Sequence, residues 1–281
     1  MGGATLYVVA TPIGHLGDLT ARAAETLRAV PVVAAEDTRR SRTLLSHLDA
    51  HPRLISYHAH SPAQATQAIL ESLRDGRDVA LVTDAGTPGI SDPGAALVAL
   101  VRNAGFPVVP IPGPSAVTTA LSAAGLAADR WCFLGFLPRK GPERAQLLQR
   151  IGREEWTTVL FEAPGRVEGL LADLVAVCGG ERRAVVAREL TKIHEEFLSG
   201  TLSELGAILS GMEADLKGEC SVLIEGTPAP VAVDATAKAI PVAKQLLAAG
   251  VSRRDAASLL TDLLGVSRNE AYRLVTEVDE S

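Results

Sequence analysis

The loop at residues 83–93, TDAGTPGISDP, combines groups that can bind a small polar ligand. From Asp84 to Gly94 it holds two aspartates, three glycines and two prolines. Proline stiffens the backbone, and glycine lets backbone N–H and C=O groups approach a ligand without side-chain obstruction. Such donors and acceptors suit a neutral or zwitterionic cofactor with an amino-acid end and an adenosine end. Two consecutive turns without a ligand are the alternative interpretation.

Two further loops share this character. Residues 11–18, TPIGHLGD, lack the G-x-G-x-x-G spacing, which disfavours a dinucleotide. Residues 111–116, IPGPSA, are framed by Pro and Gly, and Ser115 can cap the apolar helix that follows. Each of the three loops follows a strand-like run, and ligands of open α/β sheets lie at the carboxyl ends of the strands. The sequence therefore predicts that the three loops form one site.

Short Val-rich runs alternate with helical spacing in the first part of the chain. The runs show little polar alternation, as expected for parallel strands that helices cover on both faces. Helical spacing is found at 20–29 and 62–75. The sequence predicts an α/β domain over residues 1–116. Its strands are expected at 6–10, 32–35, 54–57, 79–83 and 108–111.

A second mixed α/β domain is predicted over residues 117–227. It contains a helix-like ALSAAGL segment, a Pro/Gly-rich basic loop at 136–145, and strand-like runs at 157–163, 184–189 and 220–226. The stretch TPAPVAV at 227–233 reads as a linker. Residues 234–281 are predicted to form a helix-turn-helix-like module of three helices. These helices are expected at about 236–249, 253–264 and 268–278, the last two capped by Ser252 and Ser267.

The composition is typical of a soluble globular protein. Of the 281 residues, 47% are hydrophobic and only 4% aromatic, and the formal net charge is −6. Few aromatic residues argue against a base-stacking platform, and the negative charge requires that a nucleic-acid partner be held by local basic patches. No uninterrupted apolar run approaches the roughly 18 residues of a membrane span, so no membrane partner is expected.

Three cysteines, Cys132, Cys178 and Cys220, lie far apart in the sequence. Their odd number and their spacing argue against both a disulfide framework and a paired-thiolate metal site. We expect them to behave as small buried hydrophobic residues. No metal is expected, and a cytoplasmic location fits best.

The three loops occur together with FEAPGR at 161–166, RELTK at 188–192 and GECSVLIEG at 218–226. This ordered set closely resembles the ribosomal RNA small subunit methyltransferase I branch of the tetrapyrrole-methylase superfamily, and the helical tail resembles that branch's C-terminal extension. The resemblance implies a class III methyltransferase fold of two α/β domains with S-adenosylmethionine in the cleft between them. It also implies 2'-O-methylation of a cytidine ribose in the decoding region of 16S rRNA, with the 30S subunit as partner, by a homodimer.

Carried over residue by residue, the resemblance also assigns a cofactor site. Tetrapyrrole-specific members commonly have a GDP triplet where this chain has Gly86-Thr87-Pro88, and this departure favours the rRNA branch. The residues implied to bind the cofactor are Pro12, Ile13, Asp84, Thr87, Pro88, Ile90, Ser115, Ala116, Phe161, Glu162, Ala163 and Cys220.

A ribose hydroxyl is a weak nucleophile at neutral pH, so a side chain must accept its proton or stabilise the developing alkoxide. The sequence EDTRRSR at 36–42 places two acids beside three arginines; a capped helix start with a solvated basic turn is the alternative. Glu189 and Lys192 are three residues apart and can instead form an ion pair. The candidate catalytic residues are Asp37, Asp84, Glu189 and Lys192. The candidate RNA contacts are Arg39, Arg40, Arg42, Arg139, Lys140 and Arg144.

Two other functions remain open. A tetrapyrrole or precorrin C-methyltransferase would use the same scaffold, but the arginine clusters and the helical module argue against it. A non-catalytic rRNA-binding protein with a vestigial cleft would not bind S-adenosylmethionine, so calorimetry separates it from an enzyme.

Overall fold

The computed structural model describes residues 3–58, 61, 63–211, 218–227 and 235–279. The chain divides into two compact units, one that ends at Gly226 and one that begins at Thr227, and each unit is described by itself. No helix in these ranges is long and apolar enough to span a membrane.

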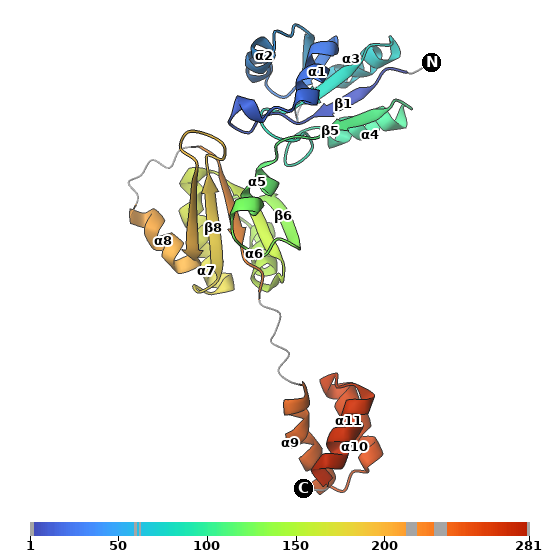
Figure 1. Cartoon of the computed structure of the whole chain (residues 1–281), viewed down its shortest axis with the longest axis vertical. Helices are drawn as coiled ribbons and strands as arrows, with labels where there is room; N and C mark the ends of the chain where they lie inside the picture. The colour runs from blue at the N-terminus through green and yellow to red at the C-terminus, as the bar shows by residue number, and fades with distance from the viewer. Residues whose placement is uncertain (1–2, 59–60, 62, 212–217, 228–234, 280–281) are drawn as a thin grey trace. The chain divides into compact units, whose positions relative to one another are not determined.

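The first unit begins with a five-stranded parallel sheet of order β3-β2-β4-β1-β5, which confirms the predicted parallel α/β architecture (Figure 1). Every residue of β2 and β4 is buried, because helices cover both faces. Leu27 and Leu45 of α1 and α2 pack on one face, and Ile69 and Leu97 of α3 and α4 pack on the other. The strands are β1 (Leu6–Val9), β2 (Val32–Ala35), β3 (Arg53–Ser56), β4 (Val79–Val82) and β5 (Val108–Ile111). The helices are α1 (Ala21–Ala29), α2 (Thr38–His47), α3 (Ala63–Arg74) and α4 (Ala95–Asn103).

A second sheet, of order β6-β7-β10-β8-β9, completes this unit. Only β6 and β7 pair in parallel, and the other neighbours are antiparallel, so the strand directions in this sheet are mixed. Its strands are β6 (Trp131–Phe136), β7 (Thr157–Glu162), β8 (Arg183–Arg188), β9 (Glu196–Thr201) and β10 (Cys220–Ile224). Its helices are α5 (Ala116–Ala123), α6 (Pro142–Arg153), α7 (Pro164–Cys178) and α8 (Leu202–Gly211).

The two faces of the second sheet have different partners. Helices α6, α7 and α8 cover one face with a leucine-rich cluster. On the other face, Val159 and Leu223 pack with Val117 of α5 and with Ile13 from the loop after β1. This mixed cluster joins the two sheets. The basic loop predicted over 136–145 is shorter than expected, because Pro142 begins α6, a position that suits the fixed φ of proline.

The second unit contains α9 (Ala235–Ala248), α10 (Arg253–Leu264) and α11 (Arg268–Asp279), which confirms the three predicted helices. Ser252 Oγ accepts a hydrogen bond from Asp255 N at 3.2 Å, and Ser267 Oγ accepts one from Glu270 N at 3.4 Å, so both predicted caps form. Except for Thr227, the predicted linker lies outside the described residues. The domain limits 1–116, 117–227 and 234–281 stay a prediction.

Candidate cofactor site

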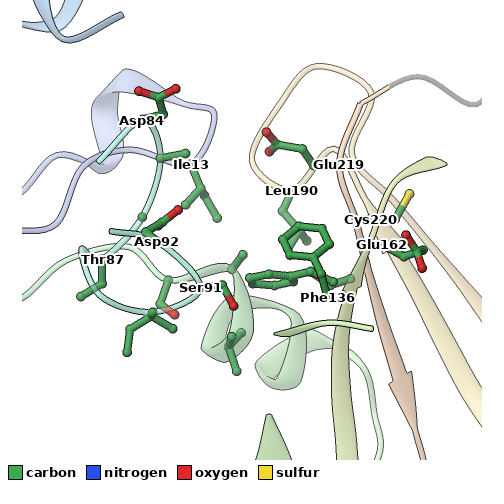
Figure 2. A pocket seen from close by; sticks show the side chains of 18 of the residues that line it. Ile13, Asp84, Thr87, Ser91, Asp92, Phe136, Glu162, Leu190, Glu219 and Cys220 are labelled. Carbon is green, nitrogen blue, oxygen red and sulfur yellow. The ribbon is translucent and has the colours of Figure 1, made fainter. Parts of the chain in front are cut away.

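A cavity of about 420 Å³, the main cavity, lies at the carboxyl ends of the first sheet's strands and against the second sheet (Figure 2). The first sheet contributes Ile13 from the loop after β1, residues 84–87 and 90–92 from the loop after β4, and residues 115–117 at the start of α5. The second sheet contributes the end of β7 and residues 218–221. The three loops that the sequence predicts to form one site therefore line a single cavity.

Most of the predicted cofactor residues line the main cavity, but two do not. Pro12 lines a smaller neighbouring cavity, and Pro88 is buried and lines neither cavity. Ser115 occupies the N-cap position of α5, but its side chain makes no capping hydrogen bond, so the predicted cap is wrong. The predicted residues that line the cavity are Ile13, Asp84, Thr87, Ile90, Ser115, Ala116, Phe161, Glu162, Ala163 and Cys220.

The loop after β4 is fixed by hydrogen bonds to the loops after β1 and β5. Thr11 N donates to Gly86 O at 2.9 Å and Gly86 N donates to Thr11 O at 3.1 Å, which ties this loop to the one after β1. Gly86 has a φ of 85°, a conformation that glycine adopts without strain. Thr87 Oγ1 donates to Pro114 O at 3.2 Å, so Thr87 links the loop to the start of α5. Thr87 thus has a positioning contact at the place where tetrapyrrole-specific members carry an acid.

The same loop approaches the second sheet at Ser91. Ser91 has a φ of 60°, which is unusual for a residue with a side chain. A Cβ on Gly135, at the bulge of β6, would lie 2.7 Å from Ser91 Oγ. Only glycine at position 135 permits this approach. Backbone strain of this kind is commonly kept at ligand sites.

The carboxylates of Glu36, Asp84 and Asp92 line the first-sheet side of the main cavity. Thr83 Oγ1 donates to Glu36 Oε2 at 2.6 Å, and Asp37 N donates to Asp84 Oδ1 at 3.0 Å. Burial raises the pKa of Asp84. Burial, reinforced by the negative charge of Glu36, raises the pKa of Asp92 to about 6. The sequence interpretation did not assign Asp92 to the site, although its place eight residues after Asp84 in the same loop was the available signal.

The raised pKa of Asp92 predicts a pH-dependent stability. The folded protein disfavours ionised Asp92, so the contribution of this residue is most favourable below pH 4 and is lost as the pH rises from 3.8 to about 6. Asp92→Asn is therefore expected to raise the melting temperature at pH 7.5 and to leave it nearly unchanged at pH 4. Thermal unfolding at both pH values, with exposed Asp129→Asn as control, measures the difference. Equal shifts at the two pH values would contradict the raised pKa.

All four predicted catalytic residues are engaged in structural contacts, which for Asp84 are those with Asp37 N and with Arg40. Asp37 caps α2 by accepting from Arg39 N at 2.8 Å and pairs with the Arg39 guanidinium at 2.7 Å. These hydrogen bonds lower the pKa of Asp37 to about 2. Glu189 Oε1 accepts from Lys192 Nζ at 2.8 Å and from Glu219 N at 3.2 Å. The hydrogen bond from Lys192 lowers the pKa of Glu189, which fits the ion-pair interpretation.

Residues 189–195, here the strap, connect β8 to β9 and contact the loop after β1. Thr191 Oγ1 accepts from His15 N at 3.0 Å. Glu189 and Thr191 both have positive φ, at 51° and 62°. A Cβ on Gly14 would lie 2.6 Å from Lys192 Cγ and 2.8 Å from Leu190 O. Close packing of the strap against the first sheet therefore requires glycine at position 14.

We expect Gly14→Ala to lower the free energy of unfolding by about 1–3 kcal/mol, because the added methyl group overpacks this contact. The matched control is Gly169→Ala in α7, where a Cβ meets open space. Alanine at that helical site is expected to stabilise the protein. Denaturant unfolding of both variants provides the comparison, and equal stabilities would show that the strap does not require Gly14.

The predicted RNA contacts fall into two groups. The Arg39 and Arg40 side chains are 87% and 64% exposed on α2, and Arg42 is exposed on the same helix. Arg139 and Lys140 are exposed before α6. Arg144 differs, because its side chain is only 13% exposed, pairs with Asp173 at 2.7 Å and donates to Pro138 O at 3.0 Å. The exposed cations of the predicted set thus lie on α2 and on the turn before α6, and the two contacts of Arg144 hold that turn in place.

The cysteines match their expected role in part. All three are free; Cys220 is buried, whereas Cys132 and Cys178 are half-buried. Burial raises the pKa of Cys220, which lines the main cavity, to about 11. Its thiol is therefore protonated at neutral pH and is a poor nucleophile.

Comparisons with known proteins agree with this fold. Residues 5–206 match the family model described as tetrapyrrole (corrin/porphyrin) methylases. Solved structures with the same fold include uroporphyrin-III C-methyltransferase from Thermus thermophilus complexed with S-adenosylhomocysteine and a cobalt precorrin-4 methyltransferase. Each is 18% identical and matches 79% of this chain, with TM-scores of 0.58 and 0.59 over 97% and 94% of the respective structures.

Curated relatives are considerably more similar. The ribosomal RNA small subunit methyltransferase I of Synechocystis is 46% identical over 98% of both chains. The protein of the same name from Pseudomonas aeruginosa is 43% identical over 97% of both chains. The chain therefore belongs to the tetrapyrrole methylase family, and within it to the ribosomal RNA small subunit methyltransferase I group.

Proposed function

We propose that this protein transfers a methyl group from S-adenosylmethionine to the 2'-hydroxyl of a cytidine in the decoding region of 16S rRNA. We further propose that it acts on the 30S subunit in the cytoplasm, as a homodimer. The observation that carries the proposal is the main cavity, whose apolar and acidic walls come largely from the part of the chain that matches the family model.

The residues of the main cavity fit S-adenosylmethionine. Ile13, Leu190 and the Phe136–Phe161 pair, whose ring centroids lie 5.6 Å apart, offer apolar surface to an adenosine. Asp84 and Asp92 offer negative charge to a sulfonium and an ammonium group. The buried carboxylate of Glu162 lies 3.1 Å from the Arg166 guanidinium, which offsets its charge. When bound, the cofactor supplies an electrophilic methyl group and leaves as a neutral thioether.

Asp84 is the best placed of the candidate proton acceptors. It lines both the main cavity and its smaller neighbour, whereas Asp37 lines neither cavity. In our proposal, the Asp84 carboxylate takes the proton of the ribose hydroxyl while the ribose oxygen bonds to the methyl carbon. Glu189 then acts as a positioning residue, because it accepts hydrogen bonds from Lys192 of the strap and from the backbone of Glu219, which precedes β10.

The proposed RNA contacts follow from exposed charge. With a net charge of −6, the protein needs local cationic surface to hold a polyanion. Arg39, Arg40 and Arg42 provide such a surface beside the cavities, and Arg139 and Lys140 provide a second one. We propose that these five side chains contact rRNA phosphates and that Arg144 positions the turn that carries two of them.

The direct test uses 30S subunits from a strain that lacks the corresponding methylation. Incubation with the protein and labelled S-adenosylmethionine, followed by mass spectrometry of 16S rRNA fragments, should reveal one 2'-O-methylcytidine. Naked 16S rRNA in parallel shows whether the assembled subunit is required. Methyl transfer to a porphyrinoid with none to either RNA would overturn the proposal, and failure to bind the cofactor in calorimetry would favour a non-catalytic RNA-binding protein.

A further inference from the structure

A smaller cavity of about 220 Å³, here the side cavity, adjoins the main cavity. The two share a wall, in which Asp84 and Ala85 come from the loop after β4 and Glu219 precedes β10. Figure 2 shows Asp84 and Glu219 on facing sides, from the two sheets. A ligand in the side cavity would therefore lie directly beside a ligand in the main cavity.

The remaining walls of the side cavity suit a nucleoside. Leu16, 44% exposed in the loop after β1, and Leu44 of α2 offer apolar surface to a flat base from two different elements. Ser41 and Thr43 of α2 add hydroxyl groups. Such a mixture of apolar contacts and a few polar groups characterises small-molecule sites.

Two cations that line the side cavity can contact the phosphates of a nucleotide. Arg40 lies 3.6 Å from Asp84 Oδ2 yet keeps 64% of its side chain exposed, so much of its guanidinium faces solvent. Lys192, on the strap, lies 3.5 Å from Glu219 Oε2 and is 31% exposed. Although burial opposes it, the pKa of Lys192 is raised by Glu189 and Glu219, so the ammonium group is charged at neutral pH. Arg40 lies on α2, which packs on the first sheet, and Lys192 lies between β8 and β9 of the second sheet.

The side cavity, at about 220 Å³, is too small to admit a nucleotide together with its stacked neighbours. A nucleotide stacked in an RNA helix is surrounded by its neighbours, whereas enzymes that modify a nucleotide commonly accept it unstacked in a close-fitting pocket. A ribose against Asp84 would place its hydroxyl at the boundary with the main cavity, where the methyl group must be delivered.

We propose that the side cavity is the pocket for the target nucleotide, which enters extruded from the rRNA. Its base lies between Leu16 and Leu44, its ribose faces Asp84, and its phosphates contact Arg40 and Lys192. This inference rests on the proposed function, because it assigns the substrate pocket of that same reaction.

The test fills the side cavity without touching the main one. Thr43 lines only the side cavity and is exposed on α2, so Thr43→Tyr should fold and block entry. Ser46→Tyr, one turn along the same helix and outside both cavities, is the matched control. We expect Thr43→Tyr to lower kcat/KM on 30S subunits by about 100-fold, since small displacements of a reacting group have effects of this size. Calorimetric affinity for S-adenosylhomocysteine and filter-binding affinity for 30S subunits should match those of Ser46→Tyr.

Leu16→Trp fills the same cavity from the loop after β1 and serves as a second variant if Thr43→Tyr unfolds. Wild-type activity in a folded filling variant would overturn the pocket assignment. Loss of S-adenosylhomocysteine binding by Thr43→Tyr alone would show that the cavities are not separate sites, and would also overturn it. Absence of methyl transfer by the unaltered protein would instead refute the proposed function.

Discussion

Asp84→Asn is expected to lower kcat/KM for methylation of 30S subunits by about 10²- to 10⁴-fold, the range for loss of a general base. Asparagine keeps the size of the side chain and an oxygen that can accept the hydrogen bond from Asp37 N, but it cannot take up the ribose proton. Because burial raises the pKa of Asp84, wild-type activity should fall on acidification as this carboxylate becomes protonated. Single-turnover rates across pH measure both effects.

The matched control for Asp84 is Asp75→Asn. Asp75 is an exposed carboxylate that also pairs with an arginine, Arg77, at 2.7 Å, but it precedes β4, whereas Asp84 follows it, and it lines neither cavity. Its replacement should leave the rate unchanged. If Asp84→Asn reacts at the wild-type rate and still loses activity on acidification, Asp84 is excluded as the proton acceptor. Asp92 would then be the next carboxylate to examine, because it also lines the main cavity.

Ala116→Trp is expected to weaken binding of S-adenosylmethionine by about 100-fold, the upper end of the 1–3 kcal/mol that overpacking costs. Ala116 begins α5 and lines the main cavity, so an indole there takes the space that the cofactor needs. Isothermal titration calorimetry gives the affinity directly. The methylation rate should recover in part at high cofactor concentration, because the proposed acceptor and the side cavity are unaltered.

Ala123→Trp provides the control for Ala116. Ala123 is exposed at the last turn of the same helix and lines neither cavity. The Ala123→Trp variant should bind the cofactor like the wild type, and both tryptophan variants should show the same far-UV circular dichroism. Equal affinities of the two tryptophan variants would place the cofactor outside the main cavity.

The sequence predicts the first sheet well because its strands are buried on both faces. Runs such as VVAA at 32–35 and VALVT at 79–83 need only be apolar and β-branched to fill a sheet covered by helices, so composition alone identifies them. The caps at Ser252 and Ser267 are equally local, because each depends on a side chain and an amide three residues apart.

Strand β9 was not predicted from the sequence, and its position explains why. It is an edge strand that pairs only with β8, and none of its residues is fully buried. Glu196–Thr201 therefore carries little apolar pattern, and Gly200 weakens what remains. Its hairpin with β8 contains the strap, whose contact with Gly14 joins residues that are distant in the sequence.

The candidate site could be predicted as a set of loops but not as a set of side chains. Strand-end position places Asp84 and Ala116 near a ligand, because all parallel strands end at one edge of the sheet. Whether Pro88 faces the cavity or the core depends on how its loop folds back, and Pro88 is buried. Glu219 enters from the second sheet, and local sequence carries no signal for a contact made across two sheets.

The mixed cluster that joins the two sheets has a thermodynamic consequence. Ile13 belongs both to this cluster and to the wall of the main cavity, and so does Val117. A ligand that contacts both sheets adds its binding energy to their junction, in proportion to the logarithm of its concentration relative to its dissociation constant. The cofactor thereby couples the unfolding of the first sheet to that of the second, so saturation with ligand favours a single cooperative transition for the whole α/β unit.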